Sequence, residues 1–162
     1  MREIKTSVTN FIHHQGKYLF IHRTADRKVD ANLLNGIGGK VEPGEDFLSA
    51  AIRETEEETG YVVTKQDVIF AGMGRTEAGY PEDWVMGFFK IEVPSFKIPI
   101  GSSCREGEFL WLTIDEALEQ TIELVDDLHY LLKMVDENKL PFFINAQFND
   151  QEKIEKMSLT HL

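Results

Sequence analysis

Hydrophobic and polar residues alternate with two different periods along the chain, and together they predict strands before and after a central helix. Runs rich in β-branched and aromatic residues favour strands. We expect strands at 7–13, 17–22, 67–73, 84–93, 109–113 and 142–144, and the segment 33–37 leads to the paired glycines Gly38 and Gly39. The first two runs flank His14-Gln15-Gly16, a short connection that predicts a β-hairpin. The segment after Ile144 is polar and is expected to form a tail.

Helical periodicity marks three further segments. From Asp46 to Thr59 the apolar residues share one face, and Gly60 suits a C-cap. That face comprises Phe47, Leu48, Ala51, Ile52 and Thr55. A brief helix is expected at 114–120 and a longer one at 124–138, where four leucines and a valine have core spacing. This order of elements implies an α/β fold in which helices cover both sides of a mixed sheet.

The connections between these elements carry their own signals. Polar residues at 23–30 and a segment with prolines, glycines and serines at 94–107 predict surface loops. A turn at 41–44 leads into the central helix. Before it, Gly38 and Gly39 can take backbone angles closed to other residues and allow a carbonyl to approach a ligand closely.

Length and charge narrow the class of protein. A chain of 162 residues with 42% hydrophobic content is expected to form one domain over 1–162. Its net charge of −11 argues against a nucleic-acid polymer as partner, because such binders need clustered basic residues. An acidic protein can still bind a small phosphorylated substrate through divalent cations. Monomer and homodimer both remain open.

Cysteine usage and hydropathy bear on the cellular compartment. Cys104 is the single cysteine, so no internal disulfide forms and a reducing compartment is the simplest interpretation. No segment approaches 18 uninterrupted apolar residues, and the first residues lack the apolar core of a signal peptide. We therefore expect a soluble cytoplasmic protein with no membrane partner.

One stretch, Gly39 to Tyr61, concentrates acids on the central helix and reads GKVEPGEDFLSAAIRETEEETGY. At 100° per residue, Glu54, Glu57 and Glu58 fall within an arc of roughly 100°. Glu56 points almost the opposite way. Three carboxylates on one face repel one another unless a cation lies among them or water screens them. Oxygen ligands of this kind suit Mg²⁺ or Mn²⁺, and a solvated acidic helix face is the alternative.

The spacing of this stretch resembles the Nudix box, G-x5-E-x7-R-E-U-x-E-E-x-G-U, in which U is a bulky apolar residue. Seven fixed residues at ordinary usage match by chance about once in 10⁸ starting positions. Thr55 departs from the pattern at the first U, a position on the buried stripe that concerns packing more than chemistry. The box marks enzymes that hydrolyse a nucleoside diphosphate linked to another moiety, and the resemblance implies an α/β/α sandwich with a mixed β-sheet.

The resemblance implies a role for each charged residue of the box. Glu54, Glu57 and Glu58 would ligate a divalent metal, Mg²⁺ or alternatively Mn²⁺. Either Glu57 or Glu58 would also act as general base, and the sequence does not separate the two roles. Arg53 lies four residues before Glu57 and would orient a carboxylate through a charge-assisted fork.

Further ligands are expected from segments outside the helix. Gly38 or Gly39 would offer a backbone carbonyl to the metal. Glu45 lies on the preceding turn and supports either the loop or the acidic cluster. Family members often recruit another acid from a loop after the long central strand, for which Glu106 and Glu108 are the candidates, Glu106 being preferred. Loop acids are also commonly just solvated.

Two segments point to a purine substrate. The residues NGIGGKV at 35–41 resemble the segment before the box in the oxidised-purine nucleoside triphosphatase branch of the family, where the asparagine contacts the base. This resemblance assigns base binding to Asn35. Asp126 and Asp127, predicted at the start of a helix, resemble the adjacent aspartates with which that branch reads the purine edge. Two acids in a first helical turn are also favourable for the helix dipole alone.

The stacking partner of the base departs from that branch. Its tryptophan precedes the aspartates by two residues, and Leu124 stands at the matching position here. Trp84 or Phe11 would have to take its place, although both residue types more often belong to the core.

The leading hypothesis is a Mg²⁺-dependent hydrolase that converts a purine nucleoside triphosphate, such as 8-oxo-dGTP, to the monophosphate and pyrophosphate. One alternative is hydrolysis of ADP-ribose or a dinucleoside polyphosphate. The other is a module that senses a nucleotide without cleaving it, although such domains usually lose box acids that this chain retains.

Overall fold

The computed structural model describes residues 1–28, 30 and 32–162. Its strands are β1 (Ile4–His14), β2 (Lys17–Arg23), β3 (Leu34–Asn35), β4 (Ile37–Lys40), β5 (Val68–Glu77), β6 (Asp83–Glu92), β7 (Ser103–Cys104), β8 (Gly107–Leu112), β9 (Phe142–Phe148) and β10 (Ile154–His161). Its helices are α1 (Phe47–Thr59), α2 (Ile114–Leu118) and α3 (Leu128–Asp136), with a short 3₁₀ turn at Lys65–Asp67.

In the described part of the chain the strands form one mixed sheet in the order β10-β9-β5-β6-β1-β2-β8-β7. β1 lies parallel to β6, and β5 lies parallel to β9. The β1–β2 hairpin is confirmed, but its two strands pair only near the turn, where His13 opposes Tyr18. Beyond that point β4 runs antiparallel to β1 and brings Gly39 opposite Val8. The strand β4, which contains Gly38 and Gly39, therefore pairs with β1 and lies close to α1.

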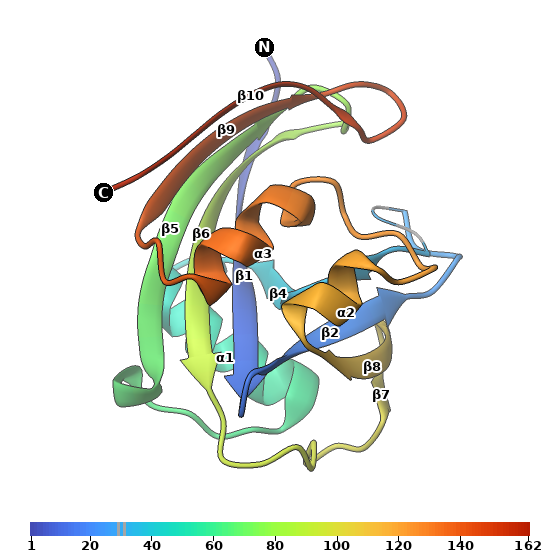
Figure 1. Ribbon diagram of the computed structural model, residues 1–162. Helices are drawn as coiled ribbons and strands as arrows, with labels where there is room; N and C mark the ends of the chain where they lie inside the picture. Colours follow the sequence, from blue (N-terminus) through green and yellow to red (C-terminus); the bar gives the residue numbers. More distant parts are fainter. Residues whose placement is uncertain (29, 31) are drawn as a thin grey trace.

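Helices cover both faces of the sheet, which confirms the predicted α/β/α sandwich. Figure 1 shows α1 behind the strands and α3 in front of them. Two hydrophobic clusters match these layers: one joins α2 and α3 to β5, β6 and β9, and the other joins α1 to β1, β2 and β6. Among the described residues, no helix is both long and apolar enough to cross a bilayer.

The helix α1 has the boundaries that its sequence predicts. Asp46 is the N-cap, and its carboxylate accepts a hydrogen bond from the Ser49 amide at 2.7 Å. Gly60 ends the helix with φ 80°, a conformation that favours glycine. The predicted apolar face is wrong at Leu48, which is 38% exposed, and Glu54 is buried instead. The face that packs on the sheet is rotated relative to the prediction, because small residues such as Ala50 and Ala51 allow close contact.

The longer predicted helix at 124–138 begins too early. Leu124 instead forms an isolated bridge with Leu34, and the Val125 amide donates to the Leu34 carbonyl at 2.9 Å. After this pairing, Asp126 and Asp127 form a turn, and α3 begins at Leu128 with Asp127 as its N-cap. Asp126 and Asp127 therefore precede the helix, and its first turn contains no acid.

The predicted polar tail is also wrong, because β9 continues to Phe148 and β10 pairs with it antiparallel. β10 faces solvent along most of its length, so its sequence lacks the apolar alternation of a buried strand. The segment before the paired glycines contains the short strand β3 and the start of β4, which are separated at Gly36 and pair with different neighbours. Of the predicted loops, 94–107 also contains β7, and 23–30 includes position 29, which lies outside the described residues.

Candidate active site

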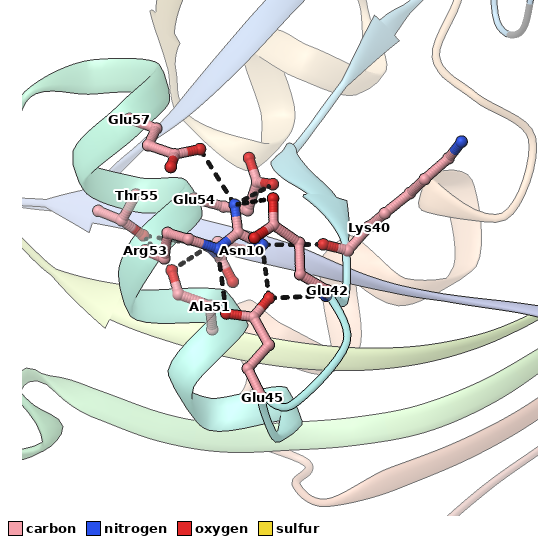
Figure 2. A network of polar contacts seen from close by, with 9 residues as sticks. All are labelled: Asn10, Lys40, Glu42, Glu45, Ala51, Arg53, Glu54, Thr55 and Glu57. Atoms are coloured by element: carbon pink, nitrogen blue, oxygen red, sulfur yellow. Dashed lines mark hydrogen bonds and ion pairs between the residues drawn. The ribbon is translucent and has the colours of Figure 1, made fainter.

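Arg53 lies at the centre of the acidic helix face and connects it to the preceding turn and to β4 (Figure 2). Its Nε and Nη2 donate to the two Glu45 carboxylate oxygens at 3.0 and 2.6 Å. Its Nη1 donates to Glu54 at 2.8 Å and to Glu57 at 3.0 Å, and Nη2 also donates to the Lys40 carbonyl at 2.9 Å. A guanidinium has five donors in a rigid fork, so one side chain holds three carboxylates in place.

Glu45 supports the turn and Arg53. Besides Arg53, its carboxylate accepts a hydrogen bond from the Glu42 amide at 2.8 Å. The hydrogen bond from Arg53 is the main cause that lowers the pKa of Glu45 below its usual value. Glu45 is thus an anion that is already satisfied by the protein.

Glu54 is the buried member of the acidic face. Burial is the main cause that raises the pKa of its carboxyl; Arg53 opposes this rise, and Glu58 and Glu57 add to it. A single guanidinium therefore does not offset the negative charge at this position. A carboxylate in this state gains from a cation beside it.

The other two box glutamates extend outward on the same face. Glu57 is exposed and Glu58 is half-buried, with Glu58 close to the Cys104 thiol, whose pKa is raised chiefly by burial. Within the residues that the structure describes, no three acidic, histidine or cysteine side chains already converge on a point that could hold a metal. Because Glu57 is exposed, its side chain can change rotamer without displacing the core.

The glycines of β4 are required by close approach and not by unusual backbone angles. Neither belongs to the positive-φ residues, so the predicted conformational reason is wrong. A Cβ on Gly38 would lie 1.9 Å from the Val8 carbonyl oxygen, and one on Gly39 would lie 2.3 Å from a Glu54 carboxylate oxygen. Gly39 thus allows its backbone to lie directly beside the buried carboxylate.

The departure from the box at Thr55 has a partner on the sheet. Thr55 is fully buried; its hydroxyl donates to the Ala51 carbonyl at 2.8 Å and accepts from Asn10 Nδ2 at 3.0 Å. Asn10 Nδ2 also donates to the Ala51 carbonyl at 2.9 Å. Figure 2 shows this contact beside the Arg53 network. A polar pair thus replaces an apolar contact between α1 and β1, and sequence alone could not reveal the pairing.

Glu106 and Glu108 differ in their surroundings. Glu106 forms ion pairs with Arg23 at 3.0 Å and with Arg27. Glu108 is an exposed position of β8 opposite His22. These contacts connect Glu106 to β2 and the following loop, and its predicted role as a metal ligand stays a prediction.

A cavity of about 510 Å³ is lined by residues of β1, β4, β6 and the start of α3, whereas Glu54, Glu57 and Glu58 are not among its lining residues. Gly38 and Gly39 line it at one end, and the predicted base-binding residues Asn35 and Asp127 also line it. Four cationic side chains surround the same space despite the negative net charge of the chain: Lys5, Arg23, Lys28 and Lys40.

The two predicted aspartates have different partners. Asp126 accepts a hydrogen bond from the Ile154 amide at 2.8 Å and so holds the start of β10. Asp127 lines the cavity, is 8% exposed, and its Oδ1 has no hydrogen-bond partner among the described residues. Burial raises the pKa of Asp127 to about 7, and the neighbouring Asp30 adds to the rise.

Asp30 is a cavity residue that the sequence did not single out. It lies in a polar loop where no periodicity marks it, and it becomes buried only because Tyr80 and Asp127 meet it from other segments. Of the two aromatic candidates, Trp84 lines the cavity, whereas Phe11 is a core residue that stacks on Phe88 with ring centroids 6.1 Å apart.

Comparisons with known proteins identify the family. The family described as NUDIX domain matches residues 2–133, most of the chain, so this protein belongs to the Nudix family.

Individual relatives share the fold or part of the sequence. A MutT protein from Bacillus halodurans has a TM-score of 0.79 at 19% identity, and the match covers 96% of this chain and 97% of that protein. A Nudix hydrolase from Nitrosomonas europaea has a TM-score of 0.66 at 25% identity, and the match covers 85% of this chain and 91% of that protein. The asymmetrical bis(5'-nucleosyl)-tetraphosphatase of Rattus norvegicus is 33% identical over 84 residues, which are 50% of this chain and 56% of that protein. The chain thus spans about half the length of the curated relatives it matches.

Proposed function

We propose that this protein hydrolyses a purine nucleoside triphosphate, including oxidised forms such as 8-oxo-dGTP, to the monophosphate and pyrophosphate. The observation that carries the proposal is that one cavity is lined both by the glycines of β4 and by the predicted base-binding residues. Gly39, which touches Glu54 of the acidic helix, and the polar side chains of Asn35 and Asp127 line the same space. A nucleotide lying in it would place phosphates near the glutamates and its base near the polar end.

The donor set fits Mg²⁺, or Mn²⁺ in its place. Glu54, Glu57, Glu58 and a carbonyl of Gly38 or Gly39 would supply oxygen ligands, and burial, with a smaller contribution from Glu58 and Glu57, raises the pKa of Glu54. When bound, the ion would neutralise charge on the phosphate oxygens and lower the pKa of the attacking water. The further assignment of Glu106 as a ligand rests on the family pattern alone.

The side chains of the chain itself supply positioning and proton transfer. Arg53 fixes Glu54 through a charge-assisted hydrogen bond of 2.8 Å. Glu57 and Glu58 are not enclosed by the core, so either carboxylate can accept the proton that the attacking water loses. The cationic rim of the cavity favours an anionic triphosphate over a neutral ligand.

The base would be held at the other end of the cavity. The side-chain Oδ1 of Asn35 accepts a hydrogen bond from the Gly36 amide at 2.8 Å, which orients the side chain. Its Nδ2 then donates to Asp30 Oδ2 at 3.4 Å. Asp127 offers an unpartnered oxygen nearby in the lining. Trp84 is the aromatic residue available for stacking. The lone Cys104 remains consistent with a reducing compartment such as the cytoplasm.

A dinucleoside polyphosphate is the second candidate substrate, favoured by the name of the Rattus norvegicus relative. It shares the phosphoanhydride chemistry and differs in requiring room for a second nucleoside. ADP-ribose and non-catalytic sensing are the remaining alternatives.

Incubation of the purified protein and Mg²⁺ with a panel of nucleotides tests the proposal. We expect release of pyrophosphate and monophosphate from a purine nucleoside triphosphate, with higher kcat/KM than for dinucleoside tetraphosphate or ADP-ribose. Release of orthophosphate alone, or no product from any nucleoside triphosphate, would contradict it. Tight nucleotide binding without product would indicate a sensor.

A further inference from the structure

Asp30 is a buried residue in the lining of the cavity, although it comes from a loop. Its carboxyl is 9% exposed, and Oδ1 accepts a hydrogen bond from the Tyr80 hydroxyl at 3.0 Å. Its other oxygen, Oδ2, accepts from Asn35 Nδ2 at 3.4 Å. Asp30 therefore connects the turn after β5 with the strand that carries the base-binding asparagine.

Asp30 and Asp127 form a buried pair of carboxyl groups. Burial is the main cause that raises the pKa of Asp127, and the nearby Asp30 carboxyl adds to the rise. Burial is the main cause that raises the pKa of Asp30, and Tyr80 and Arg23 oppose it. A buried oxygen without a partner is costly, yet Asp127 Oδ1 is such an atom and belongs to a residue that lines the cavity. This combination indicates a polar ligand at that point.

The loop that delivers Asp30 is anchored on both sides. Before it, the Thr24 amide donates to the Glu106 carbonyl at 3.1 Å, and Arg27 pairs with the Glu106 carboxylate. After it, the Leu33 amide donates to the Asp30 carbonyl at 3.2 Å. The His22 ring and the Asn32 side chain are hydrogen-bonded at 2.9 Å. These contacts hold described residues on both sides of Asp30 against β2 and Glu106.

We propose that Asp30 is a specificity-determining residue that hydrogen-bonds the edge of the substrate's base together with Asp127 and Asn35. This inference rests on the proposed function and deepens it, because it names a polar reader that lies outside the family box. Tyr80 is a positioning residue, since its hydroxyl contacts Asp30 and holds it toward the cavity.

The chemistry of the pair suits a base that has donors and an acceptor on one edge. A protonated carboxyl presents one O–H donor beside its acceptor oxygen, and an ionised carboxylate presents acceptors alone. The amide of Asn35 adds a donor and an acceptor. A guanine-type edge, with adjacent N–H groups and a carbonyl, can satisfy all of these atoms, whereas a site built for such an edge rejects a base that leaves them unpaired.

The test compares Asp30→Asn with wild type in the full chain. Dissociation constants are measured by calorimetry for guanine and cytosine 5'-(α,β-imido)triphosphates, which are not cleaved at that linkage, and kcat/KM is measured for the corresponding triphosphates. We expect the guanine-to-cytosine preference to fall about tenfold or more in both measurements. Tyr80→Phe removes only the hydroxyl and is expected to change the same ratio in the same direction but by less.

Asp26→Asn is the matched control, because Asp26 lies in the same loop, carries the same charge and is exposed outside the cavity lining. It should leave the preference unchanged. If Asp30→Asn does not fold, as judged by its thermal unfolding curve, Tyr80→Phe alone decides the question by its effect on the ratio.

The outcomes separate this inference from the proposed function. No pyrophosphate from wild type defeats the proposed function, and the calorimetric ratios still test Asp30. A wild type that binds both analogues equally, or a ratio that Asp30→Asn and Tyr80→Phe leave unchanged, overturns the inference even if hydrolysis is intact.

Discussion

Single residues organise the acidic helix through contacts that the sequence only partly reveals. Arg53 could be predicted to orient a carboxylate, because it lies four residues before Glu57 on a helix, and the structure confirms a 3.0 Å contact between them. Its contact with Glu45 across the turn depends on how the chain enters the helix. The link between Thr55 and Asn10 joins residues 45 positions apart, which no local pattern encodes.

The Thr55 hydroxyl should contribute to stability and not to catalysis. Thr55→Val keeps the shape of the side chain but removes one of the two acceptors of Asn10 Nδ2 in a buried contact between α1 and β1. We expect the free energy of unfolding to fall by about 1–2 kcal/mol, measured by urea denaturation. The value of kcat should stay within about twofold, because Arg53 and the box glutamates keep their contacts.

The same substitution at Thr160, an exposed position of β10, provides the control and should change stability by less than about 0.5 kcal/mol. Equal stability of Thr55→Val and wild type would show that the buried hydrogen bonds make no net contribution.

Whole elements were predictable where one face is buried. The hairpin, α1 and the long strand β6 show clear periodicity, and their boundaries agree with prediction to within a few residues. The edge strand β10 was missed, because an element that is exposed on most positions has no apolar period. The start of α3 was misplaced, because the bridge between Leu34 and Leu124 overrides local helical preference. In both cases pairing with another backbone segment, and not the local hydrophobic pattern, determined the structure.

Asp126 should support the attachment of β10 and leave base preference intact. Asp126→Ala removes the carboxylate that accepts from the Ile154 amide, so the start of β10 should fray. A loss of about 1 kcal/mol would lower Tm by roughly 2–4 °C. Hydrogen exchange should accelerate at the first amides of β10 and not in α1.

Asp150→Ala serves as the control, since Asp150 is an exposed residue of the turn between β9 and β10. A changed ratio of kcat/KM between purine and pyrimidine triphosphates in Asp126→Ala, with Tm unchanged, would give Asp126 a role in base recognition instead.

At the scale of the whole molecule, the fold brings together groups that are far apart in the sequence. The box itself could be predicted as a functional unit, because its residues lie on one helix and the strand before it. The cavity could not, because it requires Asp30, Tyr80 and Asp127 from three separate connections to meet over β4. The expectation of one domain over 1–162 stays a prediction.

The most direct test of the account is the rate of pyrophosphate release from a purine nucleoside triphosphate by Glu57→Gln and Glu56→Gln at saturating Mg²⁺. The two variants make the same change at adjacent positions of α1, and Glu56, also exposed, points away from the acidic face. The account predicts that kcat falls by roughly 100-fold or more in Glu57→Gln, with Tm nearly unchanged, and stays near wild type in Glu56→Gln. Near-normal turnover by Glu57→Gln, or equal losses in both variants, would contradict it.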